Sequence, residues 1–215
     1  MKIGGFVKQS LIDYPGKIAA IVFTQGCNFR CGYCHNPQLV LPGLFQTAPE
    51  YTVDTITNFL GQRKNWLDGV VITGGEPTIH KGLPNFMLEL KQLGYCVKLD
   101  TNGTNPIMLA SIIQDKLADY IAMDIKTLTE PHLYSNITGI SMSIADMENI
   151  VRSIGLLKSA KIESEFRTTF IPGTHKEKII NQIREMLGNA KPYFINNFRA
   201  GENINTIQIG PKVPR

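Results

Sequence analysis

The sequence lacks the features that usually indicate a membrane or nucleic-acid partner. No apolar run is long enough for a membrane span or a secretory signal, and the early segment contains two glycines and Asp13. The net charge of +4 comes from a mild basic excess that is spread along the chain, without clusters of Lys and Arg. We therefore expect a cytoplasmic protein that binds neither membranes nor nucleic acids.

Cysteine is also scarce, and its distribution is uneven. The chain has four cysteines, and three of them, Cys27, Cys31 and Cys34, are separated by only three and then two residues. Two disulfides would be possible in a secreted chain, but in a reducing compartment such a cluster favours ligation of a metal or an iron–sulfur cluster. Cys96 lies far from the three in sequence, and we interpret it as a small buried hydrophobic residue.

The apolar pattern predicts an α/β fold. Short β-branched runs alternate with longer stretches of helical periodicity, and the alternation repeats six times without a linker. Six βα units are fewer than the eight of a closed barrel, so we predict a partial (three-quarter) TIM-like (β/α)6 barrel with a parallel sheet, as one domain over residues 1–215. The predicted strands are 17–24, 69–73, 95–100, 119–126, 162–170 and 192–198. The predicted helices are 53–65, 83–93, 106–116, 144–158 and 176–189, the last two capped by Ser143 and by a Thr174–Glu177 capping box.

Polar and glycine-rich residues follow strand after strand in this pattern. Right-handed crossovers bring the carboxyl ends of parallel strands to one rim, where loops and helix N-termini converge. The sequence therefore predicts a single site, built from all six units. The residues at these strand ends include Gly74, Gly75, Glu76, Asp100, Thr101, Asp124, Lys126 and Arg167.

The cysteine cluster has two chemical interpretations. Gly26 and Gly32 let the loop wrap until three sulfurs point at one centre, and three thiolates on a four-iron cluster leave one iron open for a ligand. The alternative is a structural zinc with His35 as the fourth ligand. The remaining histidines, His80, His132 and His175, fall in loops or at a helix start, where we expect surface or capping roles.

Two motifs carry a family resemblance. The segment from Cys27 to Cys34 (CNFRCGYC), with Tyr33 immediately before the third cysteine, resembles the signature of the radical S-adenosylmethionine superfamily. The segment 74–77 (GGEP) resembles the superfamily's glycine-rich motif, which contacts the methionine amino group of the cofactor. Two glycines permit a close backbone approach, and Glu76 can accept a hydrogen bond from an ammonium. Standing alone, the same four residues would be an ordinary turn from strand to helix.

Within the superfamily, the chain is similar to the activating enzymes of glycyl radical enzymes, particularly those of anaerobic ribonucleoside-triphosphate reductases. This resemblance implies that Asn36 contacts the cofactor, that Asp124 and Lys126 bind its ribose or carboxylate, and that Arg167 lies near that carboxylate. It also implies a monovalent cation near Asp100, Thr101 and Asp124. The residues that carry the resemblance are Gly5-Phe6 and the segments 10–17 (SLIDYPGK), 23–37, 100–103 (DTNG), 123–126 (MDIK) and 198–199.

The resemblance implies a reaction as well as a fold. A [4Fe-4S] cluster would cleave S-adenosylmethionine reductively to a 5′-deoxyadenosyl radical, which takes a glycine hydrogen from a partner such as anaerobic ribonucleotide reductase. Flavodoxin or ferredoxin is the expected electron donor. The alternatives are a small-molecule enzyme resembling 7-carboxy-7-deazaguanine synthase and a non-catalytic iron–sulfur or zinc protein. In a purely structural role, Asp124 and Lys126 would form a buried ion pair and Arg167 would neutralise Glu165.

Overall fold

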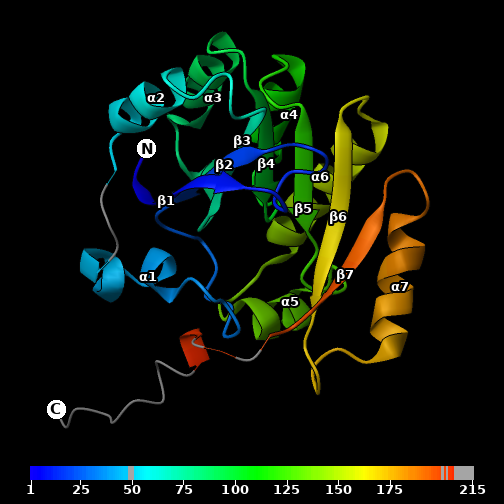
Figure 1. Cartoon of the computed structure of the whole chain (residues 1–215). Coiled ribbons are helices and arrows are strands. Elements are labelled where there is room, and N and C mark those ends of the chain that lie inside the picture. The colour runs from blue at the N-terminus through cyan, green and yellow to red at the C-terminus, as the bar shows by residue number, and fades with distance from the viewer. Residues whose placement is uncertain (48–50, 200, 202, 206–215) are drawn as a thin grey trace, which may run out of the picture.

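The computed structural model describes residues 1–47, 51–199, 201 and 203–205, and it contains one seven-stranded sheet. The strands lie in the order of the chain, so each pairs with its neighbours in sequence (Figure 1). Five pairings are parallel, and only the first strand runs antiparallel to the second. The strands are β1 (Ile3–Ser10), β2 (Ala19–Thr24), β3 (Gly69–Gly74), β4 (Cys96–Thr101), β5 (Tyr120–Asp124), β6 (Glu163–Phe170) and β7 (Tyr193–Asn197).

The predicted α/β architecture with a parallel, open barrel sheet is confirmed, and all six predicted strands form. The strand that the sequence analysis did not anticipate is β1, which pairs antiparallel with β2. Its segment contains two adjacent glycines, and its last residues are largely exposed, so it has no buried apolar run to reveal it. The antiparallel hairpin closes one edge of the parallel sheet, while β7 forms the other.

The five predicted helices are present, with several shorter ones between them. The Ser143 cap is confirmed, and it forms a capping box with Asp146. The predicted Thr174–Glu177 capping box is wrong, because Lys176 occupies the N-cap without a side-chain bond. Helix α5 was missed although Pro131 begins it and Gly139 ends it in a left-handed conformation. The helices are α1 (Pro37–Val40), α2 (Val53–Gly61), α3 (Leu83–Gln92), α4 (Pro106–Gln114), α5 (Pro131–Thr138), α6 (Ile144–Ser159) and α7 (Glu177–Leu187), with 3₁₀ turns η1 (Pro42–Thr47) and η2 (Pro77–Ile79).

The two faces of the sheet bury different amounts of apolar surface. Alternate residues of the central strands, such as Val70, Leu99 and Ile121, pack with helix residues in a large core. The other face carries a small cluster around Tyr14, against which Cys96 packs half-buried. This leaves the second face free to carry polar groups toward the rim. Among the described residues, no helix is long and apolar enough to cross a membrane.

Candidate functional site

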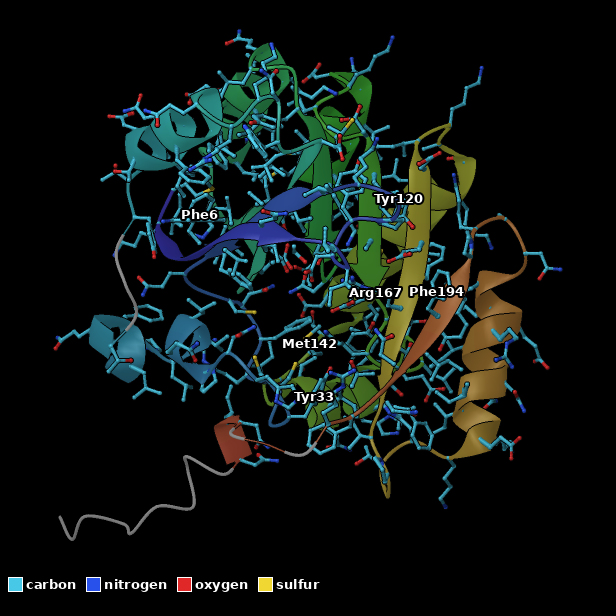
Figure 2. The ribbon with its side chains drawn as sticks, in the orientation of Figure 1. Phe6, Tyr33, Tyr120, Met142, Arg167 and Phe194 are labelled. Atoms are coloured by element: carbon cyan, nitrogen blue, oxygen red, sulfur yellow. The ribbon has the colours of Figure 1, made fainter. Side chains whose placement is uncertain are left out.

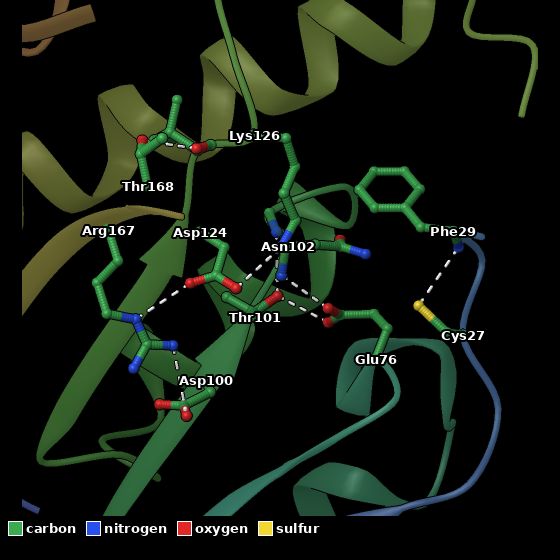
Figure 3. A network of polar contacts seen from close by, with 12 residues as sticks. Cys27, Phe29, Glu76, Asp100, Thr101, Asn102, Asp124, Lys126, Arg167 and Thr168 are labelled. Carbon is green, nitrogen blue, oxygen red and sulfur yellow. Dashed lines mark hydrogen bonds and ion pairs between the residues drawn. The ribbon is translucent and has the colours of Figure 1, made fainter. Parts of the chain in front are cut away.

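A pocket of ≈ 250 Å³ lies at the carboxyl ends of the parallel strands. It brings together every residue that the sequence analysis placed in the site, and Figure 3 shows the polar contacts of its central part. Those residues are Cys27, Cys31, Tyr33, Cys34, Asn36, Gly74, Gly75, Glu76, Asp100, Thr101, Asp124, Lys126 and Arg167. The pocket is also lined by Phe29, Asn102 and Thr169, which lie at predicted strand ends, and by Val40 and Thr73, which were not anticipated.

The cysteine loop follows β2 and is anchored from three directions. Phe29 is buried in the main core, and the Arg30 guanidinium donates to the carbonyls of Cys27 and Phe29 at 2.6 and 2.7 Å. The Arg30 amide donates to Thr138 O at the end of α5 (2.6 Å). From the far end of the chain, the Asn205 amide donates to Gly32 O (2.9 Å). The loop is therefore held in place by its contacts with the rest of the fold.

The three cysteines are desolvated. Burial raises the pKa of Cys27 to about 12, with a smaller contribution from the Glu76 charge, and burial raises the pKa of Cys31 and Cys34 as well. The Phe29 amide donates to Cys27 Sγ at 3.3 Å, as Figure 3 shows. Thiols in such surroundings carry their protons at neutral pH until a metal displaces them.

The arrangement fits a cluster better than a single metal ion. Within the described ranges, no three Cys, His, Asp or Glu side chains are close enough to hold one ion. His35, the fourth ligand of the zinc alternative, instead stacks on Phe198 with ring centroids 5.6 Å apart. Three cysteines that line one pocket but do not share one ion match a four-iron cluster, because its ligands bind different irons.

Gly74 and Gly75 let the end of β3 pack against the base of the cysteine loop. A Cβ on Gly75 would lie 1.9 Å from Gly26 O, and Gly74 has φ +113° with no room for a Cβ beside Thr24. The Gly75 amide donates to Thr24 O (2.9 Å), and the Glu76 amide donates to Gly26 O (2.8 Å). The two glycines therefore permit a contact between backbones that any larger residue would prevent.

Glu76 ties the ends of β3 and β4 together. Its side chain is only 1% exposed, and its carboxylate accepts bonds from the Thr78 amide and hydroxyl, from the Thr101 hydroxyl (2.7 Å) and from the Asn102 amide (2.7 Å). Burial raises the pKa of Glu76 even though these four donors oppose that change. Oε2 accepts only one of the four bonds, so it keeps capacity for the predicted ammonium contact, which stays a proposal.

Ionic side chains form the opposite side of the pocket. Arg167 is central: Nε lies 3.1 Å from Asp124 Oδ1, and Nη2 lies 3.4 Å from Asp100 Oδ2. Lys126 Nζ lies 3.0 Å from Asp124 Oδ2, and Lys98 Nζ lies 3.0 Å from Asp100 Oδ1. The ion pair between Asp124 and Lys126 therefore forms. Glu165 is the weaker partner of Arg167, at 3.9 Å, and it accepts a bond from the Tyr120 hydroxyl.

The charges of this network compensate one another. Burial alone would raise the pKa of Asp124, but Lys126 and Arg167 hold it well below its ordinary value. Burial would likewise lower the pKa of Lys126, whereas Asp124 keeps it well above the ordinary value. Asp124 and Lys126 therefore stay ionised in this partly buried site, and they can recognise a charged ligand without a change of protonation.

Sequence reasoning missed the residue that positions Lys126. His175 is 3% exposed, which contradicts its expected surface or capping role. Its Nδ1 accepts from the Ile171 amide (3.0 Å), so its Nε2–H faces Lys126 O at 2.9 Å. The Lys126 amide donates to the Tyr134 hydroxyl (3.2 Å), and Lys126 Nζ lies 5.9 Å from the centre of the Tyr33 ring. No local sequence pattern predicts the contact between His175 and Lys126, because the two residues are 49 positions apart.

Comparison with known proteins defines the class of this fold and site. Residues 21–186 match the Radical SAM superfamily, so the chain belongs to this superfamily of enzymes. Membership implies a [4Fe-4S] cluster and S-adenosylmethionine as cofactors, and the three cysteines in one pocket fit that requirement. The family resemblance predicted from the cysteine and glycine motifs is thereby confirmed.

Individual relatives narrow the comparison. Two proteins of Methanocaldococcus jannaschii named as glycyl-radical enzyme activating enzymes are 34% and 30% identical to the chain; the matches cover 91% and 94% of this chain and 79% and 75% of theirs. The pyruvate formate-lyase-activating enzyme of Staphylococcus aureus is 36% identical over 54% of this chain and 49% of its own.

Solved structures share the fold. Streptococcus suis SuiB bound to S-adenosylmethionine superposes with a TM-score of 0.62 at 15% identity, over 84% of this chain and 42% of that one. The structure of anSMEcpe with bound AdoMet gives 0.59 at 18% identity, over 82% of this chain and 50% of that one. The chain thus spans about half the length of these two structures or less.

Proposed function

We propose that this protein activates a glycyl radical enzyme. The cluster that Cys27, Cys31 and Cys34 would hold would supply one electron for the reductive cleavage of bound S-adenosylmethionine, and the net reaction would yield methionine, 5′-deoxyadenosine and a glycyl radical on the partner. The observation that carries the proposal is the meeting of three cysteines, two obligatory glycines and a compensated ionic network in one pocket. The names of the three relatives described above support the choice of partner class.

In this proposal each side of the pocket has its own task. Cys27, Cys31 and Cys34 hold the cluster in a desolvated loop that limits access of water. Arg167 and Lys126 present positive charge to a carboxylate of the cofactor. Asn36 begins α1 without using its side chain as a cap, so its amide remains available for cofactor contact. No side chain of the chain needs to donate or accept a proton in this reaction.

The proposal extends to partners that leave no motif in a single sequence. Anaerobic ribonucleotide reductase is the proposed protein substrate, and flavodoxin or ferredoxin is the proposed electron donor. The competing outcome is that the protein acts on a small molecule and resembles 7-carboxy-7-deazaguanine synthase in function. Incubation with candidate glycyl radical enzymes, followed by electron paramagnetic resonance, separates the two, because only an activase generates a protein-bound glycyl signal.

A monovalent cation near Asp100, Thr101 and Asp124 is a further part of the proposal. The carboxylates of Asp100 and Asp124 already pair with Lys98 and Arg167, so an added ion would compete with these protein cations. We expect S-adenosylmethionine to bind more tightly in K⁺ or Na⁺ than in choline at equal ionic strength. Equal affinity in all three salts would mean that no cation binds there and that the Lys98 ammonium alone balances the charge of Asp100.

The chemical step is tested by the production of 5′-deoxyadenosine. The protein is reconstituted anaerobically with iron and sulfide, reduced, and supplied with S-adenosylmethionine. We expect the native protein to form product and Cys31→Ala to form none. The matched control is Cys96→Ala, since Cys96 packs half-buried in the cluster around Tyr14 and should be dispensable. A fully loaded native protein without product would exclude both enzymatic interpretations.

A further inference from the structure

A second hollow adjoins the cofactor pocket and leads away from it. It has a volume of ≈ 300 Å³, and two of its lining residues, His35 and Thr169, also line the cofactor pocket. The other four belong to the end of β7 and the residues after it: Asn196, Asn197, Phe198 and Arg199. The hollow therefore lies between the cofactor pocket and the carboxyl end of β7, at the edge of the sheet.

That edge has unpaired backbone groups. Within the described residues, β7 is the last strand of the sheet, and only β6 pairs with it. The Phe198 amide donates to Phe170 O, and Pro192 O accepts from the Phe166 amide. The backbone N–H and C=O groups of the even-numbered residues in 192–198 therefore point toward β6. Because the N–H and C=O of one strand residue point to the same side, those of Ile195 and Asn197 point away from the sheet.

The side chains do not protect this edge. Strand β7 has neither a charged residue nor a proline, although native edge strands usually carry such features against unwanted pairing. Phe194 is 50% exposed and Ile195 is 37% exposed. Phe194 is in register with Arg167, and the two are neighbours in Figure 2. The exposed edge therefore runs directly beside the ionic side of the cofactor pocket.

We propose that the free edge of β7 and the adjoining hollow bind an extended segment of the protein substrate by backbone pairing. The inference rests on the proposed function and deepens it. The groups on offer are two backbone N–H and C=O pairs, two side-chain amides and the Thr169 hydroxyl, which match a peptide backbone. Arg199 and His35 are the only basic side chains among the described residues that line the hollow, so a phosphate-rich ligand is not favoured.

The position of the edge explains how a glycine could reach the site. The target residue must enter the cofactor pocket while the chain on either side of it leaves. A strand laid along β7 advances by about 3.3 Å per residue. Such a strand passes from the exposed edge into the hollow that shares His35 and Thr169 with the pocket. The stacked rings of His35 and Phe198 would then form part of the boundary between the peptide and the cysteine loop.

The test uses a defined peptide and reconstituted protein with S-adenosylmethionine. The probe is acetyl-Thr-Val-Thr-Gly-Thr-Val-Thr-amide with two deuteriums on the glycine Cα, and a fluorescein-labelled copy for anisotropy. We expect saturable binding and transfer of deuterium into 5′-deoxyadenosine. Two further peptides carry N-methyl groups on alternate amides, one set on odd and one on even positions. Only one of the two should lose binding, because only one parity of amides can face β7.

The chain is altered at the same edge. Ile195→Pro removes the outward N–H, and we expect about fivefold weaker peptide binding from the loss of one hydrogen bond. Ile195→Ala removes most of the side chain but keeps the N–H, so its affinity should stay within about twofold of the native value. Cluster absorbance and circular dichroism verify that both variants fold. If Ile195→Pro does not fold, the N-methyl peptides still decide the matter on the native protein.

The possible failures are distinguishable. Native protein that makes 5′-deoxyadenosine but does not bind the peptide, or that loses both N-methylated peptides equally, would overturn the docking proposal and leave the proposed function standing. Native protein with a complete cluster that makes no 5′-deoxyadenosine would overturn the proposed function itself. Binding that is unchanged in Ile195→Pro would place the peptide away from the edge of β7 and also overturn the docking proposal.

Discussion

The two sides of the cofactor pocket are built on different principles. The cysteine wall, made of residues 26–36 with Gly74 and Gly75, carries thiols and is shaped by close contacts between backbones. The charged wall, made of Asp100, Asp124, Lys126 and Arg167, is shaped by mutual compensation of buried charges. From this difference we expect that added atoms destabilise the cysteine wall, whereas removal of a charge destabilises the charged wall.

The walls are also joined. Glu76 follows the glycines of the cysteine wall, and its carboxylate accepts from Thr101 and Asn102 at the end of β4. Asn102 donates in turn to the side chain of Asn28 in the cysteine loop (2.8 Å). Damage to one wall should therefore reach the other mainly through Glu76 and Asn102.

The largest effect is expected from removing a charge. Arg167→Met leaves Asp100 and Asp124 with one cation fewer in a partly buried site, which should lower the free energy of unfolding by about 3 kcal/mol. The pKa of Asp124 is depressed in the native protein, so this stabilisation is present above pH ~4 and is lost as the pH falls further. Urea unfolding at pH 7 and pH 3.5 should show the difference shrinking at the lower pH.

The matched control for that experiment is Arg152→Met on α6, where the arginine is exposed. Its effect should stay within about 0.5 kcal/mol at both pH values. If Arg167→Met were as harmless as the control at neutral pH, the charged wall would not depend on compensation, and the contrast between the walls would disappear.

A slightly smaller effect is expected from adding one methyl group. The Cβ of Gly75→Ala would meet Gly26 O, so we expect a loss of about 2 kcal/mol and a reduced iron content after reconstitution. Gly155→Ala on α6 is the control, because its Cβ meets nothing within 4 Å. A helical glycine replaced by alanine should gain up to about 1 kcal/mol. Full cluster loading in Gly75→Ala would show that the cysteine wall tolerates added atoms.

The smallest effect is expected behind the charged wall. His175→Gln should lower the free energy of unfolding by about 1 kcal/mol at pH 7.5, because the imidazole ring that hydrogen-bonds both Lys126 O and Ile171 N is lost. Burial lowers the pKa of His175, so the native protein loses stability as the pH falls below ~6.5, while the glutamine does not titrate. Urea unfolding should therefore show a gap that narrows between pH 7.5 and pH 5.5; a constant gap would mean that His175 is not held neutral.

The sequence predicted those parts of the molecule that have local signatures. Buried runs marked the parallel strands, and the cysteine and glycine motifs marked their wall, because both depend on residues adjacent in the chain. Strand β1 escaped because its adjacent glycines and exposed end give no apolar run. The burial of His175 and the stacking of Phe198 on His35 were not predicted, because they depend on partners that are distant in the sequence. The single domain over residues 1–215, the cofactor contacts and the electron donor stay predictions.

The central claim is that both walls enclose one site in which the cluster and S-adenosylmethionine meet. The most direct measurement is the electron paramagnetic resonance spectrum of the reduced, reconstituted protein before and after addition of S-adenosylmethionine. We predict that the cofactor shifts the cluster signal in the native protein, and that Arg167→Met keeps the cluster signal but needs a higher cofactor concentration for the shift. A spectrum that does not change in the native protein at saturating cofactor would contradict the account, because the two groups would then occupy separate sites.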